Sequence, residues 1–253
     1  MQEAVRRGLS IIAITDHDTT AGIAAALKHA SENLTIIPGI ELSSVSPQGE
    51  EVHILGLWID PRYEPLQEQL VVLREARHHR IDKILKRLGD LGIFLTHDDI
   101  LKHAQKDVLS RSHIASALMD KGVVKSKEEA FTTLIGQGAP AYVQRHKLIP
   151  EEAVQLLNQS GGVPVLAHPG LLKDLGILPS LIDAGLVGLE VVHPSHTPEQ
   201  EQYFLKLAED LGLLPSGGSD CHGPGGKDHI YIGKYTVPGE WVSALARRRG
   251  AWQ

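Results

Sequence analysis

At 253 residues the chain is long enough to bury the core of one large domain, and its composition, 42% hydrophobic and 22% charged, is typical of a globular protein. Its single cysteine excludes a disulfide within the chain, and no apolar run approaches the roughly 20 residues of a membrane-spanning helix, so we expect a cytoplasmic protein. A net charge of -6 argues against general attraction to nucleic acid, and we expect neither stable duplex binding nor membrane binding.

The first third of the chain alternates short strands with helical or loop segments. Residues 10–14, 34–42 and 52–58 are apolar runs rich in β-branched side chains, and residues 21–30 form an alanine-rich helical stretch. Continuous apolar strands joined through helices are typical of a parallel sheet buried on both faces.

A helical segment follows at residues 65–147. Leucine and isoleucine recur from Leu66 to Leu91 at spacings of three, four and seven, which predicts a long amphipathic helix with a basic outer face. Shorter helices are expected at residues 113–121 and 127–135, where Ser126 and Glu129 have the spacing of a capping box. We interpret this segment as a helical insertion in an α/β domain.

The alternation then resumes to the end of the chain. Helices are predicted at residues 150–158 and 198–211, and strands at residues 163–167, 188–192 and 213–218. Residues 1–64 and 148–253 would therefore form one discontinuous domain around the insertion.

The 14 histidines are the unusual feature of the composition, because imidazole is the commonest metal ligand. His17 follows the first predicted strand, Glu41 ends the second, and His168 follows a later one. Glu190 or His193 and the pair Asp220 and His222 also lie at strand ends, while His53 lies inside an apolar run. At the C-terminal ends of parallel strands such side chains converge on one site.

Taken singly, each of these residues also has a structural interpretation. A histidine beside a strand can serve as a hydrogen-bonded structural residue, and Asp220 can accept backbone N–H groups in a turn. Cys221 fits a small packing residue better than a ligand or a nucleophile.

Taken together, the motifs resemble the PHP (polymerase and histidinol phosphatase) family of metal-dependent phosphoesterases. The nearest branch is similar to enzymes that dephosphorylate nucleoside 3′,5′-bisphosphates and trim short RNA from its 5′ end. The segments that carry the resemblance are Gly8–Gly22, Pro38–Ser44, His53–Asp60, Ser110–Leu118, Gly161–Gly170, Gly188–Gln200 and Gly217–Gly223. They include ITDHDTTAG and GSDCHG, and they span nearly the whole chain in the family's order.

The resemblance implies a distorted seven-stranded, TIM-like β/α barrel with a helical insertion, and a cluster of up to three divalent ions (Mn, Fe or Zn). The positions that match the family's metal ligands are His17, Glu41, His53, His113, Asp220 and His222. Glu41 would bridge two ions, sharing one with His53 and His113 and the other with Asp220. Imidazole and carboxylate groups suit these ions.

Catalytic and substrate-binding roles are also implied by the resemblance. Asp16, Asp18 and His168 would orient ligands or handle protons around the metals. His196, Arg111 and Arg145 would hold the substrate phosphate, for which arginine offers a bidentate fork.

One departure from the family concerns the start of the sequence. Family members begin with a strand that carries a His-x-His pair, followed by an aspartate in a Ser-Asp-Gly turn, whereas this sequence begins inside the next helix. The first barrel strand and three metal ligands are therefore missing from this sequence, and we expect either a true start upstream of Met1 or a shortened form that binds fewer than three ions.

Three functions stay open on the sequence alone. The first is hydrolysis of phosphate esters of nucleotides or short 5′-phosphorylated RNA through a metal-bound hydroxide. The second is a phosphatase of a small metabolite such as histidinol phosphate. The third is a truncated, catalytically impaired metal-binding protein. The sequence does not define the oligomeric state.

Overall fold

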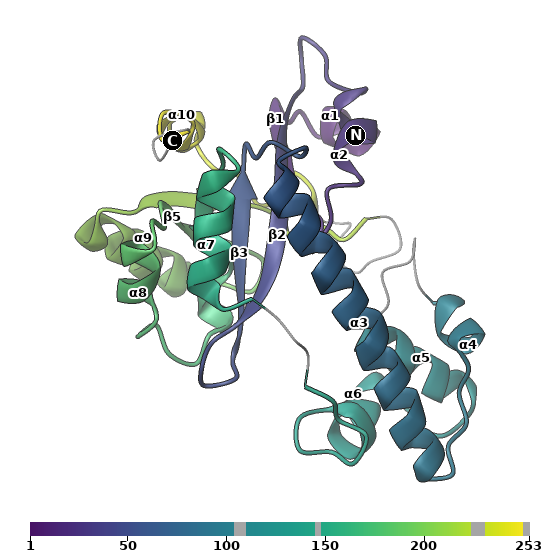
Figure 1. Cartoon of the computed structure of the whole chain (residues 1–253). Coiled ribbons are helices and arrows are strands. Elements are labelled where there is room, and N and C mark those ends of the chain that lie inside the picture. The colour runs from purple at the N-terminus through teal and green to yellow at the C-terminus, as the bar shows by residue number, and fades with distance from the viewer. Residues whose placement is uncertain (104–109, 145–147, 224–230, 250–253) are drawn as a thin grey trace. The chain divides into compact units, whose positions relative to one another are not determined.

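The computed structural model describes residues 1–103, 110–144, 148–223 and 231–249, and its ribbon is drawn in Figure 1. The chain divides into two compact units: Met1–Glu68 with Lys147–Gln253, and Gln69–His146. That the second unit is an insertion into a barrel stays a prediction.

The first unit contains a six-stranded sheet, counted over the described residues, in which the strands follow one another in sequence order. The strands are β1 (Ile11–Ile14), β2 (Thr35–Val45), β3 (Glu51–Leu57), β4 (Val163–Leu166), β5 (Gly188–Val192) and β6 (Leu214–Gly217). The fold is therefore of the mixed α/β class, whereas the seven strands of a complete barrel stay a prediction.

The prediction of an all-parallel sheet is wrong at β3. This strand pairs antiparallel with both β2 and β4, while the other neighbouring strands pair parallel. The physical reason is the link between β2 and β3, which spans only residues 46–50. A parallel neighbour requires a crossover of a dozen or more residues, whereas a link this short returns the chain as a hairpin.

Several helices of the first unit pack against this sheet (Figure 1). Outside the long helix α3 (Glu64–Asp90), the helices of this unit are α1 (Gln2–Arg6), α2 (Ile23–Leu27), α7 (Pro150–Gln159), α8 (Leu178–Asp183), α9 (Pro198–Leu211) and α10 (Gly239–Ala246). Helix α7 contacts β2, β3 and β4, and α9 contacts β5 and β6. The apolar side chains between these layers are fully buried, for example Ile54 on β3 and Leu157 on α7, and their burial is the main force that holds the layers together.

The second unit is helical and has its own core. Helix α3 (Glu64–Asp90) supplies Ile81, Ile84 and Leu88 to that core. The remaining elements are α4 (His97–Leu101), α5 (Arg111–Asp120), α6 (Lys127–Ala130) and a π-helical turn (Phe131–Ile135). Ile114 and Leu118 of α5 pack into the same cluster.

Most element positions predicted from the sequence are confirmed. All six predicted strands are present within three residues of their expected ends, and the long helix, α7 and α9 lie where they were predicted. Three helices were not predicted, namely α4, α8 and α10. They have 5, 6 and 8 residues, fewer than the roughly 11 residues over which a helical hydrophobic period is read.

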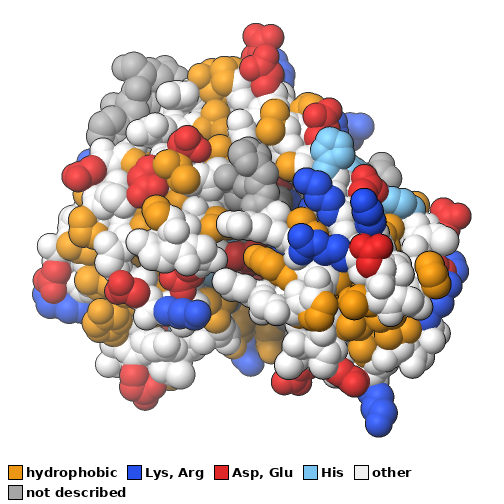
Figure 2. All heavy atoms as spheres, turned by 60° about the horizontal axis from the view of Figure 1, so that its bottom comes forward, with side chains coloured by type: hydrophobic (Ala, Val, Ile, Leu, Met, Phe, Trp, Pro, Cys, Tyr) orange, Lys and Arg blue, Asp and Glu red, His pale blue; other side chains and the backbone are white. Residues whose placement is uncertain are grey.

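Two further properties follow from the described residues. None of their helices has both the length and the apolar character needed to cross a membrane. On the face drawn in Figure 2, acidic and basic side chains are interspersed, apart from one local group of Lys and Arg side chains beside histidines.

A capping box at the start of α4 makes the second unit sensitive to acid. The backbone N–H and hydroxyl of Thr96 both donate to Asp99 Oδ2, at 3.0 and 2.9 Å, and Lys121 Nζ lies 3.1 Å from the same oxygen. These contacts hold the pKa of Asp99 below its usual value of 3.8. Since the folded-state pKa is lowered, the stabilisation is complete above the unfolded value and is lost as the pH falls below it.

We therefore expect Asp99→Asn, which removes the charge but keeps an acceptor, to be less stable than wild type at about pH 6, and the difference to be smaller near about pH 3, below the unfolded pKa of 3.8. Urea unfolding at the two pH values measures this difference. Asp90→Asn, at the exposed C-terminal end of α3, is the control. A stability gap between wild type and Asp99→Asn that stays constant with pH would contradict the prediction.

Candidate metal centre

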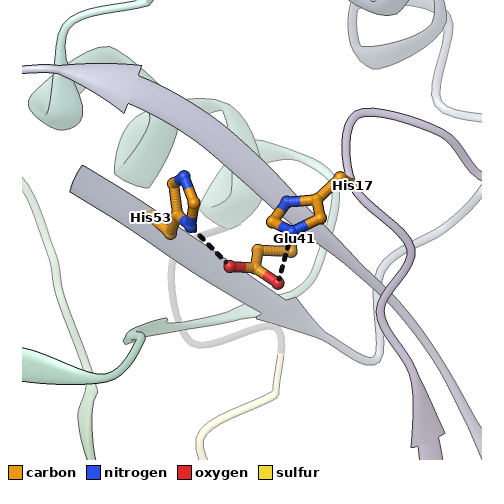
Figure 3. Close-up of side chains that lie close together, drawn as sticks. All are labelled: His17, Glu41 and His53. Atoms are coloured by element: carbon orange, nitrogen blue, oxygen red, sulfur yellow. Dashed lines mark ion pairs between the residues drawn. The ribbon is translucent and has the colours of Figure 1, made fainter. Parts of the chain in front are cut away.

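Three neighbouring strands bring His17, Glu41 and His53 together (Figure 3). His17 follows the end of β1 and pairs with Glu41 of β2 through a parallel bridge. On β3, His53 is opposite Ser43 and therefore diagonal to Glu41 on the same side of the sheet. Because β3 runs antiparallel, His53 near its beginning lies beside the end of β2. The reversed strand thus explains how a histidine inside an apolar run reaches the site.

Glu41 is the centre of this group. Its Oε1 lies 2.8 Å from His53 Nδ1, and its Oε2 lies 3.7 Å from His17 Nε2. One ligand atom from each of the three residues lies within 4.8 Å of the others, a spacing suited to a shared metal ion. Glu41 itself is only 4% exposed. A buried carboxylate of this kind requires cationic or hydrogen-bonding partners.

His168, which the sequence placed around the metals, also contacts this centre. Its Nε2 lies 3.3 Å from Glu41 Oε1 and 3.2 Å from His53 Nδ1. The sequence predicted an orienting role around the metals for His168. Its distances from Glu41 and His53 make it equally suited to a direct ligand.

The histidines control the charge of Glu41. Burial alone raises the pKa of this carboxyl, but hydrogen bonds from His168 and His53 outweigh burial and hold the pKa well below its usual 4.5. Burial lowers the pKa of His168, and the bond to Glu41 more than reverses this, so that the pKa lies above 6.5. For His17, burial is the dominant effect and the pKa is lowered. The site therefore holds an ionised carboxylate among imidazoles that share its charge.

The imidazole rings continue as a row beyond the three residues of Figure 3. Consecutive ring centroids are 5.0–5.8 Å apart along the order His222, His17, His53, His168, His193 and His196. Asp220 joins the row where its Oδ2 lies 3.4 Å from His193 Nε2. Its backbone oxygen accepts a hydrogen bond from His222 Nδ1 at 2.9 Å. The structure thus brings together most of the ligand positions that were predicted in the first unit.

The donor atoms fit a divalent metal. His17 Nδ1 and His168 Nδ1 are buried and have no hydrogen-bond partner in the described part of the chain, and buried His193 Nε2 faces the Asp220 carboxylate at 3.4 Å without hydrogen-bond geometry. Buried ring nitrogens without a partner are unfavourable unless something binds them. Imidazole nitrogens beside carboxylate oxygens form the donor set that Zn, Mn and Fe accept.

Asp16 and Asp18 flank His17 and attach its turn to β2. The N–H of Glu41 donates to the backbone oxygen of Asp16 at 3.2 Å, and the N–H of Asp18 donates to the backbone oxygen of Glu41 at 2.9 Å. Asp18 Oδ1 also accepts the N–H of Ser43 at 2.8 Å. These bonds fix the turn that carries His17 against the strand that carries Glu41, an arrangement suited to the orienting role predicted for Asp18.

Glu190 was noted at a strand end in the sequence but was given no role in the site. It is buried, and burial raises the pKa of its carboxyl to about 7. Its Oε2 accepts the backbone N–H of His168 at 2.7 Å. The signal in the sequence was GLEVV, an acidic residue in the middle of an apolar strand, where an unpaired carboxylate is costly.

His196, predicted to contact substrate, bonds to the backbone through both ring nitrogens. Nδ1 donates to the oxygen of Val191 at 2.8 Å, and Nε2 accepts the N–H of Gly170 at 3.1 Å. Contact with substrate stays a prediction for this residue, whereas its structural bonds are defined.

The remaining predicted residues belong to the second unit or lie outside the described residues. His113 is on α5 and accepts the N–H of Ser110 through Nδ1 at 3.2 Å. Arg111 packs its guanidinium over the rings of Phe131 and Tyr142, at 5.3 and 5.7 Å from their centroids. Arg145 lies outside the described residues. The ligand and phosphate-binding roles of these three stay predictions.

Comparisons with known proteins agree on one kind of chemistry. The chain is 35% identical over 233 residues to a 3′,5′-nucleoside bisphosphate phosphatase of Chromobacterium violaceum. The aligned region covers 89% of this chain and 81% of that protein. It is 32% identical over 234 residues to the 5′-3′ exoribonuclease Rnm of Escherichia coli, covering 88% and 79% of the two chains. A phosphoribosyl 1,2-cyclic phosphate 1,2-diphosphodiesterase of Eggerthella lenta is 32% identical over 232 residues, covering 90% and 88%.

Two solved structures share the fold of this chain. A chain from Bifidobacterium adolescentis, named as a metal-dependent phosphoesterase, superimposes with a TM-score of 0.84 and 31% identity, covering 98% of this chain and 89% of its own length. An amidohydrolase from Chromobacterium violaceum with bound sulfate and no metal gives a TM-score of 0.83 and 30% identity, covering 98% and 90%. No protein-family model matches the chain.

The bond from Ser43 N–H to Asp18 can be tested without any metal. Both residues are buried, so Asp18→Ala leaves a buried N–H without this acceptor, and we expect the free energy of unfolding to fall by about 1–3 kcal/mol. Asp18→Asn keeps a side-chain oxygen at the same place and serves as the matched control, with a smaller loss. Urea unfolding of the metal-free protein measures both variants. Equal stability of wild type and Asp18→Ala would show that the bond does not hold the turn.

Proposed function

This chain belongs to the PHP family of metal-dependent phosphoesterases, and we propose that it hydrolyses phosphate esters of nucleotides, either nucleoside 3′,5′-bisphosphates or short 5′-phosphorylated RNA. The observation that carries the proposal is the Glu41 carboxylate between His17, His53 and His168, in a chain whose relatives are named for phosphate ester hydrolysis. The distorted seven-stranded barrel of the family stays a prediction for this chain. We expect a cytoplasmic enzyme with Mn, Fe or Zn as its metal.

The proposed ligands divide into two groups around Glu41. His17, Asp220 and His222 would hold metal on one side of the carboxylate, since the His17 and His222 rings neighbour each other at 5.8 Å. His53 would hold metal on the other side. His113 was predicted as the partner of His53, but the 3.2 Å distance between His53 and His168 supports His168 in that position. Bound divalent ions supply a water molecule activated at neutral pH and neutralise charge on the phosphoryl group.

Other residues would hold the ligands in place and bind the substrate. Asp16 would orient the turn that carries His17, since its backbone oxygen accepts the N–H of Glu41. Arg111 and Arg145 would contact the substrate phosphate, where the guanidinium fork matches two phosphate oxygens. Contact of His196 with the substrate phosphate, implied by the resemblance, belongs to the same proposal. In this proposal the histidines of the row surround the Glu41 carboxylate and its metal, and the two arginines bind the substrate phosphate.

Two alternatives are separated by the choice of substrate. A small-metabolite phosphatase would use the same metals on an ester such as histidinol phosphate, and the Eggerthella lenta relative, named for a cyclic sugar phosphate, favours including a compound of that class in the assay. An impaired metal-binding protein would take up metal without hydrolysing any of these esters.

The activity test compares wild type with Glu41→Gln in the presence of Mn²⁺, using a nucleoside 3′,5′-bisphosphate, 5′-phosphorylated RNA and histidinol phosphate. We expect turnover of a nucleotide substrate and a loss in kcat/KM of at least about 100-fold in Glu41→Gln, since losing even the outer partners of metal ligands costs 10–100-fold. Glu240→Gln, on exposed α10, is the matched control. Turnover of histidinol phosphate alone, or wild-type activity no greater than that of Glu41→Gln, would overturn the proposal.

Metal binding is tested separately from turnover. We expect Mn²⁺ at 100 times its Kd to stabilise the wild type by about 2.7 kcal/mol per site, because the folded state alone presents the ligands together. His168→Ala should lower both the bound metal, measured by elemental analysis, and the rise in melting temperature. His113→Ala in parallel distinguishes the two candidates for the third ligand. Lower metal content in His113→Ala with normal content in His168→Ala would reject the assignment to His168.

A further inference from the structure

The turn that carries His168 has an unfavourable backbone conformation. His168 has φ 28° and ψ 59°, and a short 3₁₀ turn, Pro169–Leu171, follows directly. A side chain other than glycine in this region costs about 1–3 kcal/mol and persists only when its surroundings enforce it. The structure around the turn should therefore contain the groups that enforce it.

Two side chains, Glu190 in β5 and His196 in the segment after it, meet this requirement. Glu190 Oε2 accepts the backbone N–H of His168 at 2.7 Å, and His196 Nε2 accepts the backbone N–H of Gly170 at 3.1 Å. His196 is itself fixed, since its Nδ1 donates to the oxygen of Val191. A neutral ring with its proton on Nδ1 satisfies both bonds of His196. The turn is thus held at two points, two residues apart.

The turn also packs closely against the ring of His196. A Cβ atom added to Gly170 would lie 2.6 Å from His196 Cδ2, so the turn rests directly on this ring. Glu190 and His196 are only 6% and 7% exposed. A register shift in β5 between Glu190 and Val192 marks the place where the strand departs from regular pairing. Bulges of this kind redirect side chains next to active sites.

The turn determines where the His168 ring lies. With the backbone held in this way, His168 Nε2 lies within 3.3 Å of both Glu41 Oε1 and His53 Nδ1. An extended backbone at His168 would direct the ring elsewhere, because φ and ψ set the direction of the Cα–Cβ bond. The position of the ring is therefore sensitive to the two bonds that Glu190 and His196 accept.

We propose that Glu190 and His196 are positioning residues, which hold the turn from His168 to Gly170 so that the His168 imidazole faces Glu41 and His53. The effect on catalysis rests on the proposed function, whereas the effect on the backbone of His168 does not. Neither residue needs to touch substrate or metal in this role. Their side chains act on backbone N–H groups, which gives His196 a defined contribution independent of substrate contact.

The test uses a pair of variants of similar size at position 190. Glu190→Gln keeps an oxygen that can accept the N–H of His168, whereas Glu190→Met fills the space without an acceptor. Because burial raises the pKa of Glu190 to about 7, the uncharged amide is a close substitute for the carboxyl. Glu240→Met on α10 is the matched surface control. Melting temperatures of all variants show whether the fold is retained.

We expect Glu190→Met to bind Mn²⁺ about 10–100-fold more weakly than wild type, in the range for lost outer partners of metal ligands, and Glu190→Gln to stay within about threefold. In kinetic assays kcat should fall while KM changes little, because substrate contacts are retained. His196→Phe, which keeps a ring but loses both nitrogens, should change Mn²⁺ affinity in the same direction. Equal Mn²⁺ affinity of wild type and Glu190→Met, or equal losses in Glu190→Gln and Glu190→Met, would overturn the proposal.

A crystal structure of Glu190→Met makes the test independent of catalysis. We expect His168 to leave the positive φ region and its ring to move away from Glu41. If wild type binds Mn²⁺ but hydrolyses none of the substrates, the proposed function fails, and the Mn²⁺ affinities and this structure still decide the role of Glu190. An unchanged His168 backbone in Glu190→Met would reject the positioning role even in an active enzyme.

Discussion

The buried carboxylate of Glu41 is the constraint on which the rest of the site depends. A charge that is only 4% exposed is tolerated only among partners that share it, and the pKa of Glu41 shows that the ionised form is the one stabilised. Those partners are imidazoles from the turn after β1, from β3 and from the turn after β4. Each imidazole comes from a different part of the sheet. The charge on Glu41 is therefore stable only if the strand order brings these parts together.

The antiparallel strand β3 makes this delivery possible. In a purely parallel sheet the beginning of β3 would lie beside the beginning of β2, not beside its end. His53 would then lie far from Glu41. The five residues that link β2 to β3 reverse the chain and bring His53 into the diagonal position beside Glu41. This hairpin places His53 at the site, and it interrupts the strand–helix alternation that a parallel sheet would have had.

The candidate metal ligands were predictable from the sequence, and so were the strands near which they lie. Ligand positions such as His17, Glu41 and His53 could be found because they end or interrupt apolar runs, which is a one-dimensional signal. The direction of β3 was missed because strand composition does not distinguish parallel from antiparallel neighbours. The contacts of His168 with Glu41, and those of Glu190 with His168, depend on residues 127 and 22 positions apart, which no local pattern records.

Backbone strain in the described residues is concentrated where the ligands are carried. Four residues other than glycine have positive φ, and three of them are Asp18, His168 and Asp220. Each follows or forms part of the turn after a strand end, next to or within the histidine row. Such conformations are unfavourable alone and are retained only where side chains such as Glu190 and Asp18 bond to the backbone. The strain and the bonds that maintain it therefore have one common effect, which is to turn side chains from separate strands toward a single carboxylate.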